Sequence, residues 1–91
     1  MESRARVVFH GNVQGVFFRA TCQEKATAMG LRGWVRNRSD GAVEAVFEGD
    51  REAVEQCIAW NRDRQPHARV TEVEVSWESP VAGTEGFEIR R

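Results

Sequence analysis

The chain has 91 residues, a formal net charge of -1 and 41% hydrophobic residues. This length suits one domain over residues 1–91, because folding buries roughly 60 to 65% of the unfolded surface, enough for one modest core. No stretch has the roughly 18 apolar residues of a membrane span, no signal pattern opens the chain, and the near-neutral charge predicts no nucleic-acid partner. We therefore expect a cytoplasmic monomer that contacts neither a membrane nor nucleic acid.

The first predicted strand and helix flank a glycine-bearing loop. Apolar and polar residues alternate from Ala5 to Phe9, which predicts a strand that stops at Gly11. Apolar residues from Phe18 to Met29 are then spaced to form one stripe on a helix, and Gly30 supplies a C-terminal stop. The loop between them is thus held by two regular elements.

The middle of the chain predicts a hairpin. Two strands, over residues 31–38 and 42–48, are joined by Ser39-Asp40-Gly41, where glycine can adopt the positive φ that a tight turn requires.

The last third of the chain predicts a helix and two strands. Asp50 is a suitable helix cap, and the helix that follows it ends before Pro66. Strict alternation over residues 71–78 predicts a fourth strand, and residues 87–90 predict a short closing strand. The order β-α-β-β-α-β with a short fifth strand is typical of an α+β ferredoxin-like sandwich, in which two helices cover one face of an antiparallel sheet.

The start of the first helix carries the first candidate site. No Ser, Thr, Asp or Asn stands at the expected cap position, and Ser3 to Gln23 contains no acidic residue. The unbonded amides and the positive end of the helix dipole favour a bound phosphate, and glycine lets the backbone fold around it. Arg19 in the first turn can clamp the phosphoryl oxygens with its guanidinium. The backbone N–H groups expected to face the phosphate belong to Gln14, Gly15, Val16 and Phe17.

Asn37 is the second candidate. The first two strands of a β-α-β crossover run parallel, so their C-terminal ends lie at one edge of the sheet. Leu31, Gly33, Val35 and Asn37 alternate onto one face, which the apolar members mark as the face that the helices cover. We therefore expect Asn37 beside the loop, whereas Trp34 lies on the opposite face.

Two segments resemble the signatures of the acylphosphatase family. The first reads GNVQGVFFR over Gly11 to Arg19, and the second reads GWVRNRSDGAVEAVFEG over Gly33 to Gly49. The resemblance implies that Arg19 is the phosphate-binding catalytic arginine and that Asn37 orients the attacking water. Asn12 and the run Arg64-Gln65-Pro66 depart from residues that are frequent in the family, and neither departure is expected to impair the chemistry.

The chemistry of acyl phosphates explains why so few residues suffice. Hydrolysis expels a carboxylate, whose conjugate acid has a pKa of about 4, so the leaving group needs no general acid. Charge stabilisation and a placed water are the remaining demands of a loose phosphoryl-transfer transition state. We expect no cofactor and no metal, because His10 and His67 lack a ligand pattern and Cys22 and Cys57 read as reduced core thiols.

Alternatives to hydrolysis remain open at this point. A noncatalytic phosphate-sensing module could keep the same loop, although Asn37 argues against it. An RNA-recognition domain shares the fold, but residues 42–48 read AVEAVFE and lack its aromatic pair. The candidate residues recognise the phosphate head group and not the acyl group. A metabolic carboxylate phosphate, carbamoyl phosphate and a phosphoaspartyl protein therefore fit the predicted site equally well.

Overall fold

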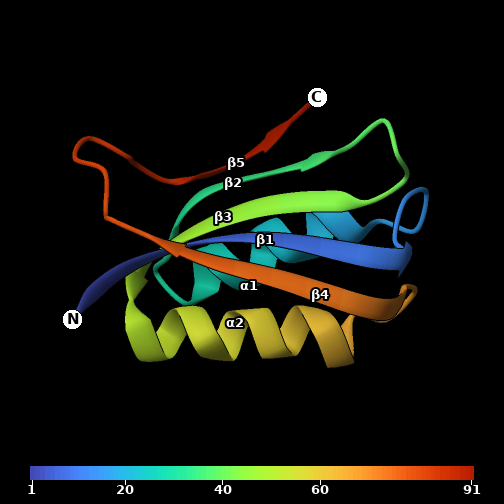
Figure 1. Ribbon diagram of the computed structural model, residues 1–91, viewed down its shortest axis with the longest axis horizontal. Helices are drawn as coiled ribbons and strands as arrows, with labels where there is room; N and C mark the ends of the chain where they lie inside the picture. Colours follow the sequence, from blue (N-terminus) through green and yellow to red (C-terminus); the bar gives the residue numbers. More distant parts are fainter.

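A five-stranded sheet with two helices against one face makes up the computed structural model, which describes residues 1–91 (Figure 1). The expected ferredoxin-like α+β arrangement is confirmed. Neither helix is long and apolar enough to cross a membrane. In chain order the elements are β1 (Glu2–Asn12), α1 (Phe18–Ala28), β2 (Arg32–Asn37), β3 (Val43–Asp50), α2 (Arg51–Arg64), β4 (Arg69–Glu78) and β5 (Phe87–Arg90).

The sheet has the strand order β4-β1-β3-β2-β5 and is mixed, which corrects the expectation of a purely antiparallel sheet. The first four strands pair antiparallel, but β5 pairs parallel with β2. The reason lies in the loop over residues 79–86. This loop begins where β4 finishes and crosses over to start β5 at the same end of the sheet (Figure 1). Since β4 runs against β2, a strand that starts at this end must run along β2.

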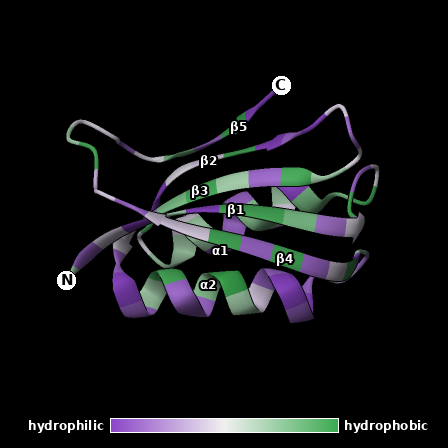
Figure 2. Cartoon of the chain, viewed as in Figure 1, coloured by the Kyte–Doolittle hydropathy of each residue, from purple (hydrophilic) through white to green (hydrophobic).

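The helix-covered face of the sheet forms the core. Inward residues of β1 and β3 such as Val7, Phe9 and Phe47 are fully buried, and they pack against Phe18 of α1 and Val54 of α2. Figure 2 shows the matching alternation of hydrophilic and hydrophobic residues along α2 and β4. This periodicity is the signal from which both elements could be predicted.

The opposite face of the sheet is polar and carries several arginine side chains around Trp34. Guanidinium groups of Arg6, Arg36 and Arg90 lie 5.7, 6.0 and 4.9 Å from the ring centre of Trp34. Trp34 therefore lies away from the helices, as the alternation in β2 predicts, and its stacked cations belong to the outer surface of the sheet.

Three connections gather at one end of the sheet. The loop between β1 and α1 lies beside the hairpin that joins β2 to β3, and the connection from α2 to β4 lies at the same end (Figure 1). β1 does not stop at Gly11 as expected; it continues to Asn12, with a register irregularity between His10 and Gly11 in its pairing with β4. This extension carries the chain directly into the loop.

Candidate active site

The loop over residues 13–17 leads into α1 through left-handed backbone. Gly15 has a φ of +74° and Phe17 a φ of +61°, and no side chain caps the helix at Phe17. The N–H groups of residues 14–17 donate no hydrogen bond within the protein. A helix N-terminus with unbonded amides attracts anions, because the amide dipoles and the helix dipole both present positive charge there.

Gln14 fixes this loop to the neighbouring hairpin. Its Nε2 donates to the carbonyl oxygens of Arg38 and Ala42 at 2.7 and 2.9 Å. Both acceptors flank the turn that follows Asn37, so the side chain of Gln14 joins the loop to the segment that carries Asn37. Asp40 shapes the same turn by accepting the N–H of Ala42 at 3.1 Å.

Arg19 extends from the first turn of α1 toward β5. Its Nη1 donates to the carbonyl oxygen of Arg90 at 3.2 Å, and the side chain makes no ion pair. Only one of the five guanidinium N–H groups is thereby bonded, which leaves most of the fork free for an anion.

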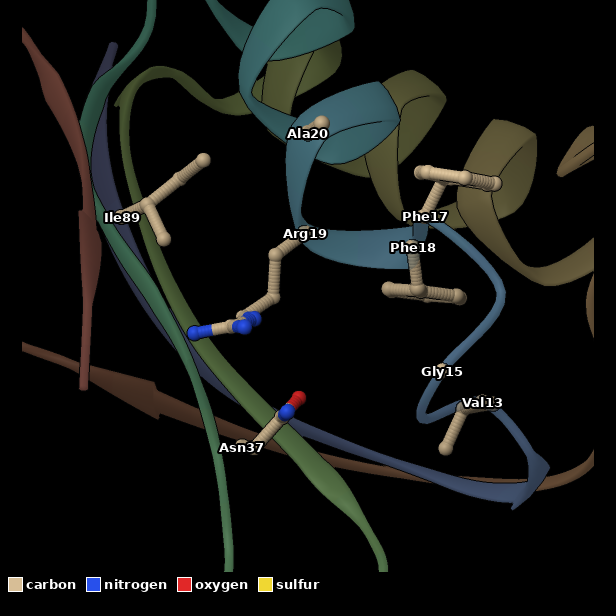
Figure 3. A pocket seen from close by; sticks show the side chains of 8 residues that line it. All are labelled: Val13, Gly15, Phe17, Phe18, Arg19, Ala20, Asn37 and Ile89. Atoms are coloured by element: carbon tan, nitrogen blue, oxygen red, sulfur yellow. The ribbon is translucent and has the colours of Figure 1, made fainter.

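Arg19 and Asn37 line the same pocket, a cavity of about 300 Å³ between α1, the loop and β2 (Figure 3). The guanidinium of Arg19 and the carboxamide of Asn37 are next to each other in this view, and Gly15 lies across the pocket from them (Figure 3). The side chain of Asn37 makes no hydrogen bond with another residue. Arg19 is the one charged residue of the lining, which consists of Val13, Gly15, Phe17, Phe18, Arg19, Ala20, Asn37 and Ile89.

The predicted residues and the lining overlap in part. Gly15, Phe17, Arg19 and Asn37 line the pocket, whereas Gln14 and Val16 do not. Gln14 is used as the anchor described above, and the side chain of Val16 packs against the core. Their proposed contribution is through backbone N–H groups, for which side-chain lining is not required.

The structure adds residues that sequence reasoning missed. Ile89 reaches the pocket because β5 pairs with β2, and Val13 and Ala20 reach it because they flank the loop and the first helical turn. Alternation along β5 assigns Ile89 to a face but gives no hint of its neighbours. Only the order of strands in the sheet could have identified it.

His10 lies near the loop in sequence but faces away from it. Its Nε2 contacts the carboxylate of Glu74 on β4, on the face opposite the helices. No group of three or more His, Cys, Asp or Glu side chains is arranged to hold a metal ion.

Both cysteines are buried and unbridged, as expected. Burial raises the pKa of the Cys22 thiol well above its usual range, and proximity to Cys57 adds to the shift. Burial likewise raises the pKa of Cys57 to about 12, against the opposing effects of Lys25 and Asn61. Neither thiol is a nucleophile near neutral pH, because the thiolate is the reactive form.

A buried amide network supports the start of α1 from behind. Gln65 donates through Nε2 to the carbonyl oxygen of Phe18 at 3.1 Å and to Oδ1 of Asn61 at 2.8 Å. Asn61, fully buried on α2, donates in turn to the carbonyl oxygen of Cys57 at 2.9 Å. The residue before Arg19 is therefore tied to the end of α2.

Fold and pocket together define the class: an α+β sandwich with a one-arginine pocket at its first strand-to-helix loop. A sequence model described as Acylphosphatase matches residues 5–89. Acylphosphatases of Rubrobacter xylanophilus and Pelotomaculum thermopropionicum are 52% and 48% identical over 96% of this chain, and the matches cover 79% and 95% of those relatives. The crystal structure of acylphosphatase from Bacillus subtilis is 34% identical with a TM-score of 0.93, over 100% of both chains.

This chain belongs to the acylphosphatase family. It is accordingly a hydrolase that converts acyl phosphates to a carboxylate and phosphate, and the resemblance of its two signature segments is confirmed.

Proposed function

We propose that the pocket holds the phosphoryl group of an acyl phosphate between Arg19 and the backbone N–H groups of residues 14–17, while Asn37 orients the attacking water. The observation that carries this proposal is the shared lining of Arg19 and Asn37 in one cavity, beside a helix start whose amides are unbonded. Positive charge on one side and a neutral amide on the other match the two demands of phosphoryl transfer.

The reaction needs no further protein group. The water oxygen forms a bond to phosphorus, and the bond from phosphorus to the oxygen that bridges it to the acyl carbon breaks. The carboxylate leaves with the electron pair of this bond. Asn37 cannot accept the proton of the water, because a carboxamide is not basic near neutral pH. In this proposal the proton passes to a phosphoryl oxygen, which yields protonated inorganic phosphate and balances the step.

We further propose that residues 1–91 form a single domain, which acts as a cytoplasmic monomer without a metal or cofactor. Two free buried cysteines suit a reducing compartment. Light scattering should give a mass near the 10.3 kDa of one chain. A dimer mass would contradict this assignment without affecting the reaction.

Removing the arginine tests the proposed function. Hydrolysis of benzoyl phosphate is measured in the presence of a metal chelator, beside a phosphate monoester, for the parent and for Arg19→Ala. The parent should cleave only the acyl phosphate, and the variant should lose about 10²- to 10³-fold in kcat/KM, the usual cost of one removed anion-stabilising donor group. Arg64→Ala, which removes an exposed arginine of α2, is the matched control. Equal activity of parent and Arg19→Ala, or a preference for the monoester, would refute the proposal.

A further inference from the structure

The pocket that contains Arg19 is apolar over most of its wall. Five of its eight lining residues are hydrophobic, and the two large ones that are exposed are Phe17 and Ile89. Large apolar side chains exposed at a concave site mark contact with a ligand more often than those scattered singly over a surface.

Phe17 is not placed there by the needs of the core. The residue is 75% exposed, and its one aromatic neighbour is His67, with ring centres 6.3 Å apart. Its φ of +61° lies in the left-handed region, which L side chains seldom adopt. The fold thus holds a large aromatic ring in solvent, in a backbone conformation that a smaller residue would fill as well.

Ile89 forms a second apolar wall from another element. It lies on the edge strand β5, opposite Val35 of β2, and is 38% exposed. Figure 3 shows Phe17 and Ile89 on two different sides of the cavity, with the side chain of Arg19 between them. The apolar lining is therefore contributed both by the residue that precedes α1 and by β5.

In-line geometry assigns this apolar region to the acyl group. Attacking and leaving oxygens lie on opposite sides of phosphorus in phosphoryl transfer. If water attacks from the side of Asn37, the acyl group leaves on the opposite side of phosphorus, where the rest of the lining is mostly apolar.

Charge in the lining points the same way. Arg19 is the only charged lining residue, and it serves the phosphoryl group and the carbonyl oxygen of Arg90. A carboxylate or second phosphate on the acyl group would find no further cation among the lining residues. It would also lose hydration water on contact with hydrocarbon, which is unfavourable for a charged group.

We propose that the site selects acyl phosphates whose acyl group is uncharged and apolar, with Phe17 and Ile89 as the residues that contact this group. The inference rests on the proposed function, because it takes the phosphoryl group to lie at Arg19 and the water at Asn37. Binding of the phosphoryl group does not specify the acyl group, and the inference adds the class of acyl group that the site prefers.

The test compares three substrates: acetyl phosphate, 4-methylbenzoyl phosphate and 4-carboxybenzoyl phosphate. The two aromatic substrates have similar size and differ in charge. The parent should give a higher kcat/KM for the methyl compound than for the carboxy compound. Ile89→Ala and Phe17→Ala should each lower the ratio of kcat/KM for 4-methylbenzoyl over acetyl phosphate by about fivefold, as expected for a partly exposed hydrocarbon contact.

A charge insertion and a matched control complete the experiment. Ile89→Lys should raise kcat/KM for the carboxy relative to the methyl compound by about threefold, the effect of an exposed ion pair. Val75→Ala should keep all ratios, because Val75 is 41% exposed on β4, the opposite edge strand of the sheet.

Two results would overturn the inference. Substrate ratios that stay within twofold of the parent in both Ile89→Ala and Phe17→Ala would show that neither side chain contacts the acyl group. A parent that prefers the carboxy compound would refute the selection for uncharged groups. In either case hydrolysis of acetyl phosphate still depends on Arg19, so the failure is distinct from that of the proposed function, in which Arg19→Ala is as active as the parent.

Discussion

Asn37 brings a neutral carboxamide to the pocket that Arg19 lines, and its side chain makes no hydrogen bond within the protein. A group that orients water acts on the chemical step more than on substrate binding. Asn37→Ala should therefore lower kcat by about 10²-fold and leave KM within about twofold. Steady-state kinetics with benzoyl phosphate measures both constants. A raised KM with unchanged kcat would instead assign Asn37 to substrate binding.

At the residue scale the sequence predicts part of this site and not the rest. Asn37 precedes a turn, and propensity alone would make it a turn residue; its place followed from the parallel course of β1 and β2. Arg19 could be predicted because an uncapped helix start next to an arginine favours an anion. Ile89 could not, because its neighbours depend on the pairing of β5 with β2, for which no local pattern exists.

At the scale of elements, the start of α1 depends on α2 through the network of Asn61 and Gln65. Oε1 of Gln65 is buried without a partner, so replacing this residue removes one unfavourable group along with two favourable bonds. The informative quantity is therefore the coupling between the two residues. In a cycle of Asn61→Leu, Gln65→Leu and the double variant, the free energies of unfolding should show a coupling of about 1 kcal/mol. Additive effects in urea denaturation would show that the bond between them contributes nothing.

Helices and central strands could be predicted because their hydrophobic periodicity records which face is buried. The helix from Phe18 and the strand over Phe87–Arg90 begin where the sequence predicts. β1 passes Gly11 because pairing with β4 continues beyond the register irregularity, a tertiary effect that strand propensity does not contain. The parallel direction of β5 likewise follows from the path of a loop rather than from the residues of the strand.

At the scale of the whole molecule, arginine and glutamate join the strands across the outer face of the sheet. Glu48 on β3 lies opposite Arg4 of β1 and Arg32 of β2, and its oxygens accept from them at 2.8 and 3.3 Å. The carboxylate of Glu44 is similarly held by Arg6 and Arg36 at 2.8 and 2.6 Å. These partners account for part of the preference for arginine over lysine, because the guanidinium fork can bridge carboxylates that are almost buried.

These pairs predict the response to acid. Burial disfavours the charged form of Glu48, but hydrogen bonds from Arg4, the N–H of Val81 and Arg32 outweigh it and hold the pKa below its usual range. A carboxyl with a lowered pKa in the folded state stabilises the fold above its unfolded pKa, about 4.3, and this contribution is lost as the pH falls through that value toward the folded pKa. Stability should therefore drop below about pH 4.5.

Glu48→Gln tests the ion pairs directly. The variant leaves Arg4 without its closest carboxylate, so it should lose about 3 kcal/mol of unfolding free energy at pH 7 and show a shallower loss between pH 5 and pH 3. Urea denaturation followed by tryptophan fluorescence at several pH values gives both numbers. A pH dependence as steep as that of the parent would mean that Glu48 does not contribute to acid sensitivity.

The central claim, that a water oriented by Asn37 attacks the phosphorus held at Arg19, is tested most directly by the position of an isotope. Benzoyl phosphate is hydrolysed in water enriched in oxygen-18, and the mass of both products is measured after correction for spontaneous hydrolysis. Attack on phosphorus breaks the bond between phosphorus and the acyl oxygen, so one labelled oxygen should enter inorganic phosphate and none should enter benzoate. Label in benzoate would mean attack on the carbonyl carbon and would contradict the mechanism.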